Sequence, residues 1–322
     1  MVRAVIAIHG GAGAIARANM SVKQEQLYIQ VLSATVSSGQ AILSASGTAL
    51  DAVTEAVRLL EECPLFNAGK GAVFTHAGTH ELDASIMDGR TLQAGAVAGV
   101  RRVRNPVLAA RAVLENSPHV MFIGEGAEAF AFRQGLEQVD EDFFSTPFRR
   151  DQLQRALSAN CMTLDHDGAG EGAPLDADRK FGTVGAVALD LHGNLAAATS
   201  TGGMTNKQVG RVGDSPLIGA GCYANNANVA VSCTGTGEVF MRALVAYDIA
   251  ALMEYASLSL KEASERVIKD KIVALGGSGG AIAIDREGNV VLPFNSEGMY
   301  RGYGYVGETP VVGIYGESQR EA

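Results

Sequence analysis

Two short apolar segments of the same design constrain the fold more than any other feature of the sequence. Gly185 to Asp190 reads Gly-Ala-Val-Ala-Leu-Asp and leads to a Gly-Asn turn, and Gly280 to Asp285 reads Gly-Ala-Ile-Ala-Ile-Asp before a second Gly-Asn pair. Small and β-branched residues that end in such a turn predict β-hairpins whose strands are buried. We therefore expect a core of antiparallel sheets.

Helical and strand patterns surround these hairpins in both halves of the chain. A capping box at Ser21 and Gln24 predicts one helix, and a second is expected from Thr48 to about Glu62. Further strands are expected at 2–8, 81–87, 91–100 and 119–123, and further helices from 105 onward and at 125–134, 152–158, 238–255 and 259–275. Elements of this kind stack in layers, so the helices of each half should cover one sheet.

Composition limits the possible partners and compartment. The 322 residues are 47% hydrophobic, which is enough for a well-formed core, and the net charge of −9 argues against a basic face for nucleic acid or anionic membranes. The four cysteines show no paired spacing, and no signal peptide or membrane-spanning apolar run is visible. We therefore expect a cytoplasmic protein.

The junction at Gly182-Thr183 carries the first sign of chemistry. Residues 165–180 are rich in Gly, Ala and Asp and have few large apolar side chains, so they predict a flexible linker. This linker meets the first hairpin strand at Thr183. If the Gly182-Thr183 bond breaks, Thr183 gains an α-amine beside its hydroxyl and can supply both nucleophile and general base. The alternative is that Thr183 is only a β-branched residue that begins a strand.

Other motifs match known sites less well. Gly11, Gly13 and Ala16 fit a dinucleotide-binding pattern, but a second helix follows where the second strand of that fold should lie. The acidic and histidine residues between 76 and 83 lack the spacing of a zinc helix. Residues 276–280 match a nucleophile-elbow pattern, but here a helix precedes and a strand follows, so we expect a turn.

Two glycine-flanked loops carry groups suited to an amino-acid ligand. In residues 210–214, Arg211 and Asp214 could hold an α-carboxylate and an α-ammonium, or could form an ordinary surface ion pair. Residues 234–238 lie between a strand and the start of a helix, where backbone N–H groups could face an oxyanion. The alternative for this second loop is simple helix capping by Thr236.

Together these motifs resemble the isoaspartyl peptidase/L-asparaginase family of N-terminal nucleophile hydrolases. The resemblance is carried by the motifs that begin at Gly182, Thr199, Gly210 and Cys233, by His9-Gly-Gly-Ala-Gly and by Asn67-Ala-Gly, and it covers nearly the whole chain. The order of the motifs is far more specific than any one of them. It favours the nucleophile interpretation of the Gly182-Thr183 junction over the strand-start alternative.

The resemblance implies an α+β fold, a four-layer αββα sandwich of two packed, mainly antiparallel sheets covered by helices. It implies one hydrolase domain over residues 1–322, self-cleaved into 1–182, with a flexible linker at about 159–182, and 183–322. The implied reactions are removal of β-linked aspartyl residues from dipeptides and hydrolysis of L-asparagine, through a β-aspartyl-threonine intermediate. A glycosylasparaginase is the nearest alternative and a nucleotide-binding protein a distant one.

The resemblance also implies roles for individual residues. Autocleavage would occur between Gly182 and Thr183, and the implied catalytic residues are Thr183, Thr201, Thr234 and Gly235, the last two as the oxyanion hole. Arg211 and Asp214 would anchor the substrate carboxylate and ammonium. The full implied substrate-binding set is Asn67, Arg211, Val212, Gly213, Asp214, Thr234, Gly235, Thr236 and Gly237.

The same resemblance implies a structural ion and an assembly. A sodium-binding loop would use mainly backbone carbonyls, from Leu60, Glu61, Cys63, Phe66, Ala68 and Lys70. No cofactor is expected for catalysis. The expected partners are small-molecule substrates, and two self-cleaved αβ units are expected to form a dimer, giving a heterotetramer.

Overall fold

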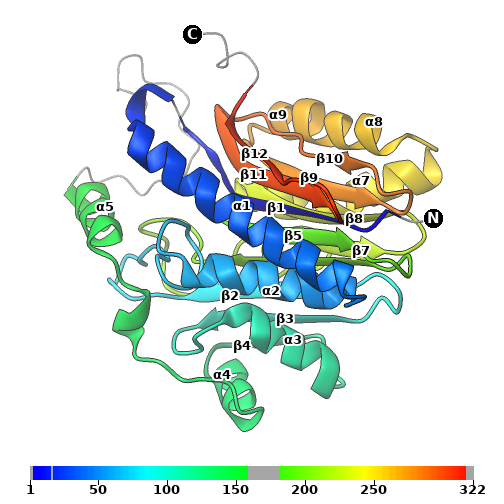
Figure 1. Cartoon of the computed structure of the whole chain (residues 1–322). Coiled ribbons are helices and arrows are strands. Elements are labelled where there is room, and N and C mark those ends of the chain that lie inside the picture. Colours follow the sequence, from blue (N-terminus) through cyan, green and yellow to red (C-terminus); the bar gives the residue numbers. More distant parts are fainter. Residues whose placement is uncertain (1–2, 16, 159–181, 317–322) are drawn as a thin grey trace.

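The computed structural model describes residues 3–15, 17–158 and 182–316, and its strands form two sheets (Figure 1). The larger sheet contains β1 (Val5–Gly13), β2 (Leu82–Asp88), β3 (Ala94–Val100), β4 (Met121–Ile123), β5 (Val184–Leu189), β6 (Leu195–Thr201), β11 (Gly298–Tyr305) and β12 (Val311–Tyr315). Its eight strands follow the order β12-β11-β1-β5-β6-β2-β3-β4. In the described ranges its pairs are antiparallel except β3 with β4.

The smaller sheet has four antiparallel strands. They are β7 (Cys222–Asn225), β8 (Val229–Gly235), β9 (Gly279–Asp285) and β10 (Val290–Val291), in the order β10-β9-β8-β7. The mainly antiparallel core expected from the sequence is thus confirmed.

Both predicted hairpins are present, as β5 with β6 and β9 with β10, and an aspartate closes each turn. One carboxylate oxygen of Asp190 accepts two backbone N–H bonds from its turn at 2.9 Å each, and one of Asp285 accepts two from its own turn at 2.8 and 3.0 Å. Gly193 and Gly288 adopt positive φ in these turns, at 81° and 86°. The repeated Asp and Gly-Asn of the sequence are therefore turn chemistry.

The two sheets pack against each other through a shared apolar core. Alternate side chains of β1 divide between two environments: Val5 and Ala7 join the cluster between the sheets, whereas Ile6 and Ile8 join the cluster beneath the helices. A strand buried on both faces reads as a nearly continuous apolar run, as β1 and β5 do.

Long helices cover the outer face of the larger sheet (Figure 1). They are α1 (Val22–Ser44), α2 (Ala49–Glu62) and α3 (Pro106–Asn116). Two shorter helices, α4 (Gly124–Arg133) and α5 (Pro147–Ser158), lie further out. Short 3₁₀ turns occupy Arg17–Asn19 and Glu141–Phe144. Helix α1 contacts β1 and β11, α2 contacts β5 and β6, and α3 contacts β2 and β3. Capping boxes at Ser21 and Thr48 begin the first two. No helix in the described ranges is long and apolar enough to cross a bilayer.

A second group of helices covers the smaller sheet, and here one prediction was wrong. The helix expected over 238–255 is two helices, α6 (Gly237–Ala243) and α7 (Val245–Tyr255), separated by Leu244 at a left-handed φ of 50°. The predicted helix over 259–275 is present as α8 (Leu260–Glu265), a π-helical segment η3 (Arg266–Lys271) and α9 (Ile272–Ala274). Their apolar side chains form a third cluster against β8 and β9.

Several strand predictions also needed correction. β3 begins at Ala94, because residues 91–93 still belong to the turn that Asp88 stabilises. β1 continues to Gly13 through a register shift after His9. β1 is antiparallel to both of its neighbours, which is not the parallel unit that the dinucleotide interpretation required.

Candidate active site

Thr183 lies directly before β5 and is 7% exposed. Its hydroxyl donates to the Thr201 hydroxyl oxygen at 3.2 Å, and that oxygen also accepts the backbone N–H of Gly203 at 3.0 Å. Thr201 ends β6, the hairpin partner of β5, so the hairpin register places the two threonines side by side. The structure therefore brings together the predicted nucleophile and the predicted orienting hydroxyl.

Gly182 packs tightly against Asn67. A Cβ built on Gly182 would lie 2.1 Å from the Cβ of Asn67, so no larger residue fits there without movement. Asn67 is buried and fixed by its own bonds, because its Nδ2 donates to the Gly203 carbonyl at 2.6 Å and its Oδ1 accepts from Val73 N at 2.9 Å. Asn67 thus packs against Gly182, the residue after which cleavage is predicted.

Thr234 and Gly235 are the last two residues of β8, and Gly235 lines the same cavity as Thr183. The Thr234 hydroxyl accepts a weak bond from Ala12 N at 3.4 Å, which ties it to the glycine-rich end of β1. A Cβ on Gly235 would lie 2.4 Å from the Ser278 carbonyl, and its φ is 158°, so this position requires glycine. Thr236 is the N-cap residue of α6, but its hydroxyl bonds with Ser278 and makes no cap bond, so simple capping by its side chain was wrong.

Arg211 pairs with Glu238 and not with Asp214. Its Nε and Nη2 atoms lie 2.9 and 2.8 Å from one carboxylate oxygen of Glu238. The surface ion pair considered as the alternative for Arg211 and Asp214 is not formed in the described structure. Glu238 lies in the motif that begins at Cys233, but nothing in the sequence indicated that it would contact Arg211.

A narrow cavity joins these groups. It is lined by Gly182, Thr183, Thr201, Gly203, Met204, Arg211, Gly213, Asp214, Ser215, Gly235 and Gly237. Of the expected site residues, Asn67, Val212, Thr234 and Thr236 do not line it. Gly203, Met204 and Ser215 were not predicted, although all three lie within or next to the quoted motifs. The cavity places the Thr183 hydroxyl, the Arg211 guanidinium and the Asp214 carboxyl group around one space.

Asp214 is the most perturbed acid of the cavity. Burial raises its pKa to about 7, and the nearby Arg211 opposes this shift. Its Oδ2 has no hydrogen-bond partner among the described residues. A buried carboxylate without a partner is costly, and a ligand ammonium would satisfy it.

His9, in the first glycine-rich motif, also contacts Thr183, the predicted nucleophile. Its Nδ1 lies 3.1 Å from the Thr183 carbonyl and its Nε2 lies 3.0 Å from the Ser232 hydroxyl. Burial lowers the pKa of His9 to about 3, so the ring is neutral. Because a carbonyl can only accept, the proton belongs on Nδ1 and Ser232 donates to Nε2. His9 thus holds the backbone of Thr183 and was missed as a site residue.

The predicted sodium loop follows the end of α2. Among the described residues, the carbonyls of Phe66, Ala68 and Lys70 accept no hydrogen bond, whereas that of Glu61 accepts from Lys70 N at 2.7 Å. The Glu61 side chain turns elsewhere: one oxygen accepts from the Ser200 hydroxyl at 2.7 Å and from Val107 N, at the start of α3, at 2.9 Å. The Lys70 ammonium lies over the Phe143 ring.

The histidines near residue 80 have other partners. His76 Nδ1 bonds with Asn206 Oδ1 at 2.9 Å. His80 bonds with the Val73 carbonyl and the Ser145 hydroxyl, and burial lowers its pKa to about 4. In residues 3–15, 17–158 and 182–316, no three His, Cys, Asp or Glu side chains converge on a metal position.

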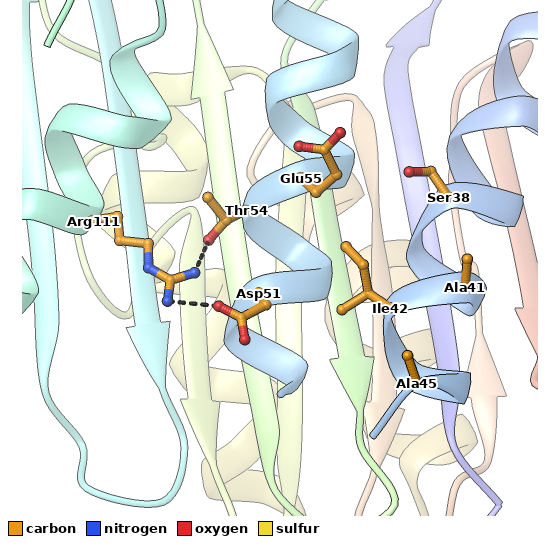
Figure 2. A pocket seen from close by; sticks show the side chains of 8 residues that line it. All are labelled: Ser38, Ala41, Ile42, Ala45, Asp51, Thr54, Glu55 and Arg111. Atoms are coloured by element: carbon orange, nitrogen blue, oxygen red, sulfur yellow. Dashed lines mark hydrogen bonds and ion pairs between the residues drawn. The ribbon is translucent and has the colours of Figure 1, made fainter. Parts of the chain in front are cut away.

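A wider hollow lies away from this chemistry, on the surface of α1 and α2 (Figure 2). Arg111 reaches it from α3 and bonds with Thr54 at 3.0 Å and with Asp51 at 2.7 Å. The arginine is paired further with Glu115 at 2.8 Å. Its charge is already neutralised, so this hollow does not resemble an anion site.

Known proteins resemble this chain along nearly its whole length. A family model described as Asparaginase matches residues 2–314. The chain is 70% identical to the isoaspartyl peptidase of Escherichia coli K12, over 98% of each chain. It is 53% identical to a putative isoaspartyl peptidase/L-asparaginase of Dictyostelium discoideum, over 94% of this chain and 93% of that protein. It is 41% identical to the isoaspartyl peptidase/L-asparaginase of Mus musculus, over 92% and 86%.

Proposed function

Because the chain belongs to the asparaginase family, we propose that it is a self-processing amidohydrolase that removes β-linked aspartyl residues from dipeptides and hydrolyses L-asparagine. One observation carries the proposal: a single cavity is lined by Thr183, Thr201, Arg211 and Asp214. The names of the relatives support the same substrates. Glycosylasparaginase activity is the secondary alternative.

Self-processing would begin with attack of the Thr183 hydroxyl on the Gly182 carbonyl carbon. The new C–O bond replaces the C–N bond and leaves an ester and a free α-amine on Thr183, and water then hydrolyses the ester. The close packing of Gly182 against Asn67 and the bond from His9 to the Thr183 carbonyl support this role, because they fix both sides of the peptide bond. The products would be residues 1–182 and 183–322; residues 159–181, the predicted linker, lie outside the described structure.

Turnover would use the same hydroxyl. Thr183 attacks the side-chain amide carbon of the aspartyl group, its α-amine takes the proton and passes it to the leaving amine, and water releases aspartate from the β-aspartyl ester. Thr201 would orient the hydroxyl, and the Thr234 hydroxyl with Gly235 N–H would stabilise the oxyanion. Arg211 and Asp214 would hold the α-carboxylate and α-ammonium.

The finer architecture belongs to the same proposal. We assign the four-layer αββα arrangement of N-terminal nucleophile hydrolases, supported by three apolar clusters that separate helices, sheet, sheet and helices. We also propose that the loop from Leu60 to Lys70 holds a structural sodium ion through backbone carbonyls, three of which accept no hydrogen bond in the described residues. A dimer of cleaved units in the cytoplasm completes the proposal.

A substrate panel tests the function. The purified protein is incubated with a β-aspartyl dipeptide, L-asparagine and an N-glycosylated asparagine, and released aspartate is measured. Hydrolysis of the first two is expected. If only the glycosylated asparagine is hydrolysed, the protein is a glycosylasparaginase. If none of the three substrates is hydrolysed, the amidohydrolase proposal is refuted.

A further inference from the structure

We propose that Glu238 is a positioning residue that holds Arg211 away from Asp214, so that both charges stay available to the α-carboxylate and α-ammonium of one substrate. This inference rests on the proposed function, since only there do Arg211 and Asp214 act as anchors.

The contact between Glu238 and Arg211 is directional. One Glu238 carboxylate oxygen lies 2.9 Å from Nε and 2.8 Å from Nη2 of Arg211, so it occupies one edge of the guanidinium. A guanidinium carries five N–H donors in a fixed plane, and the edge that contains Nη1 remains for another oxyanion. Glu238 is in the first turn of α6, so its position is set by the helix that directly follows β8.

Two glycines make room for the guanidinium in this position. A Cβ on Gly213 would lie 3.0 Å from Nη1 of Arg211, and a Cβ on Gly237 would lie 2.8 Å from Nη2. Neither glycine has a positive φ, so backbone conformation does not explain why glycine occurs at these positions. The close approach of the arginine does explain it. The arginine therefore lies in a backbone cradle and is held there by Glu238.

Asp214 also lies close to Gly237. The Cβ built on Gly237 would also lie 3.2 Å from Asp214 Oδ1, so the two anchors flank one small space. Yet they form no ion pair in the described structure, and Asp214 Oδ2 is buried without a partner. The half-buried Arg211 and the buried Asp214 attract each other, so they would be expected to pair unless another carboxylate holds the arginine. Glu238 supplies that carboxylate.

The consequence concerns substrate binding more than chemistry. Without Glu238, Arg211 can turn toward Asp214, and each anchor then neutralises the other. A zwitterionic substrate would have to break that pair before it could bind. In the described residues Glu238 forms no hydrogen bond with Thr183 or Thr201, so the chemical step should change less than the affinity.

The test is a Glu238→Ala variant, compared with Glu238→Gln and with a control. For Glu238→Ala we expect KM for a β-aspartyl dipeptide and for L-asparagine to rise about tenfold, with kcat within about threefold of the parent. Glu238→Gln keeps an acceptor oxygen without the charge and should be intermediate. The matched control is Glu265→Gln, which alters an exposed helical pair with Lys269 and should leave both constants unchanged.

A double-mutant cycle separates positioning from a general structural role. Asp214→Asn removes the carboxylate that would capture the arginine, so adding Glu238→Ala should then lower kcat/KM much less than it does in the parent. Unchanged KM in Glu238→Ala would refute the inference, and so would additive losses in the cycle. If the parent hydrolyses β-aspartyl substrates and Glu238→Ala has the same KM, only the inference about Glu238 is refuted and the proposed function stands. If the parent has no such activity, the proposed function and the inference are both refuted.

Discussion

Replacing Gly182 by alanine tests how closely the predicted cleavage site is packed. The added Cβ would lie 2.1 Å from the Asn67 Cβ, 3.0 Å from its Cγ and 3.1 Å from its Nδ2. Asn67 cannot retreat easily, because its amide is bonded to the Gly203 carbonyl and to Val73 N. The carbonyl of residue 182 must therefore move.

The size of the effect follows from the geometry. Ordinary carbon contacts are about 3.5–4.0 Å, so the clash requires a shift of roughly 1 Å or more, shared between the peptide and Asn67. Misplacing a reacting group by about 1 Å can lower a rate about a hundredfold, and overpacking costs about 1–3 kcal/mol of stability. We expect Gly182→Ala to fold but to cleave itself on the order of a hundred times more slowly than the parent.

The assay follows cleavage of freshly purified protein on denaturing gels over time. The matched control is Gly126→Ala on α4, where a Cβ meets nothing within 4 Å, and it should cleave like the parent. If Gly182→Ala cleaved itself at the parental rate, the proposed arrangement at the scissile bond would be wrong.

Two further predictions concern pH. His9 is buried with its pKa lowered to about 3, below its ordinary value near 6.5, so its contribution to stability is complete above pH 6.5 and falls as the pH drops. The free energy of unfolding in urea should be compared for the parent and His9→Asn. The difference in favour of the parent should be smaller at pH 5.5 than at pH 8 by about 1.4 kcal/mol, and a difference that does not change with pH would contradict this. Asp214 must ionise to bind an ammonium, so below about pH 7 it should add to the rise of kcat/KM with pH that the Thr183 α-amine also causes. Asp214→Asn should lose that contribution, and an unchanged pH profile in the variant would exclude Asp214 as a source.

The hairpins could be predicted from the sequence because their signals are local. The aspartate and the Gly-Asn turn that end each apolar run satisfy their own backbone groups, as at Asp190 and Asp285. Capping boxes at Ser21 and Thr48 are equally local. Such elements need no knowledge of the rest of the fold.

Strands β11 and β12 were not predicted, and for β11 the reason is tertiary. Glycine is depleted in strands, and β11 contains several. A Cβ on Gly304 would lie 2.5 Å from Gln40 Nε2, and one on Gly302 would lie 2.8 Å from Val312 Cγ1. The glycines allow α1 and β12 to approach closely, which no local pattern can indicate.

The candidate site divides in the same way. The motifs indicated Thr183, Arg211 and Asp214, because their order along the chain is distinctive. The partners His9 and Glu238 depend on contacts between distant segments, since one bonds the Thr183 carbonyl across 174 residues and the other pairs with an arginine 27 residues away. Only the structure could assign them.

The central claim is that Thr183 is released by cleavage after Gly182 and is the nucleophile. Intact-mass measurement of the purified protein, combined with N-terminal sequencing and repeated on Thr183→Ala, tests it most directly. The account predicts two fragments for the parent, one of them beginning at Thr183, and one uncut, inactive chain for the variant. A parental protein that hydrolyses β-aspartyl substrates as a single uncut chain, or a Thr183→Ala protein that still splits after Gly182, would contradict it.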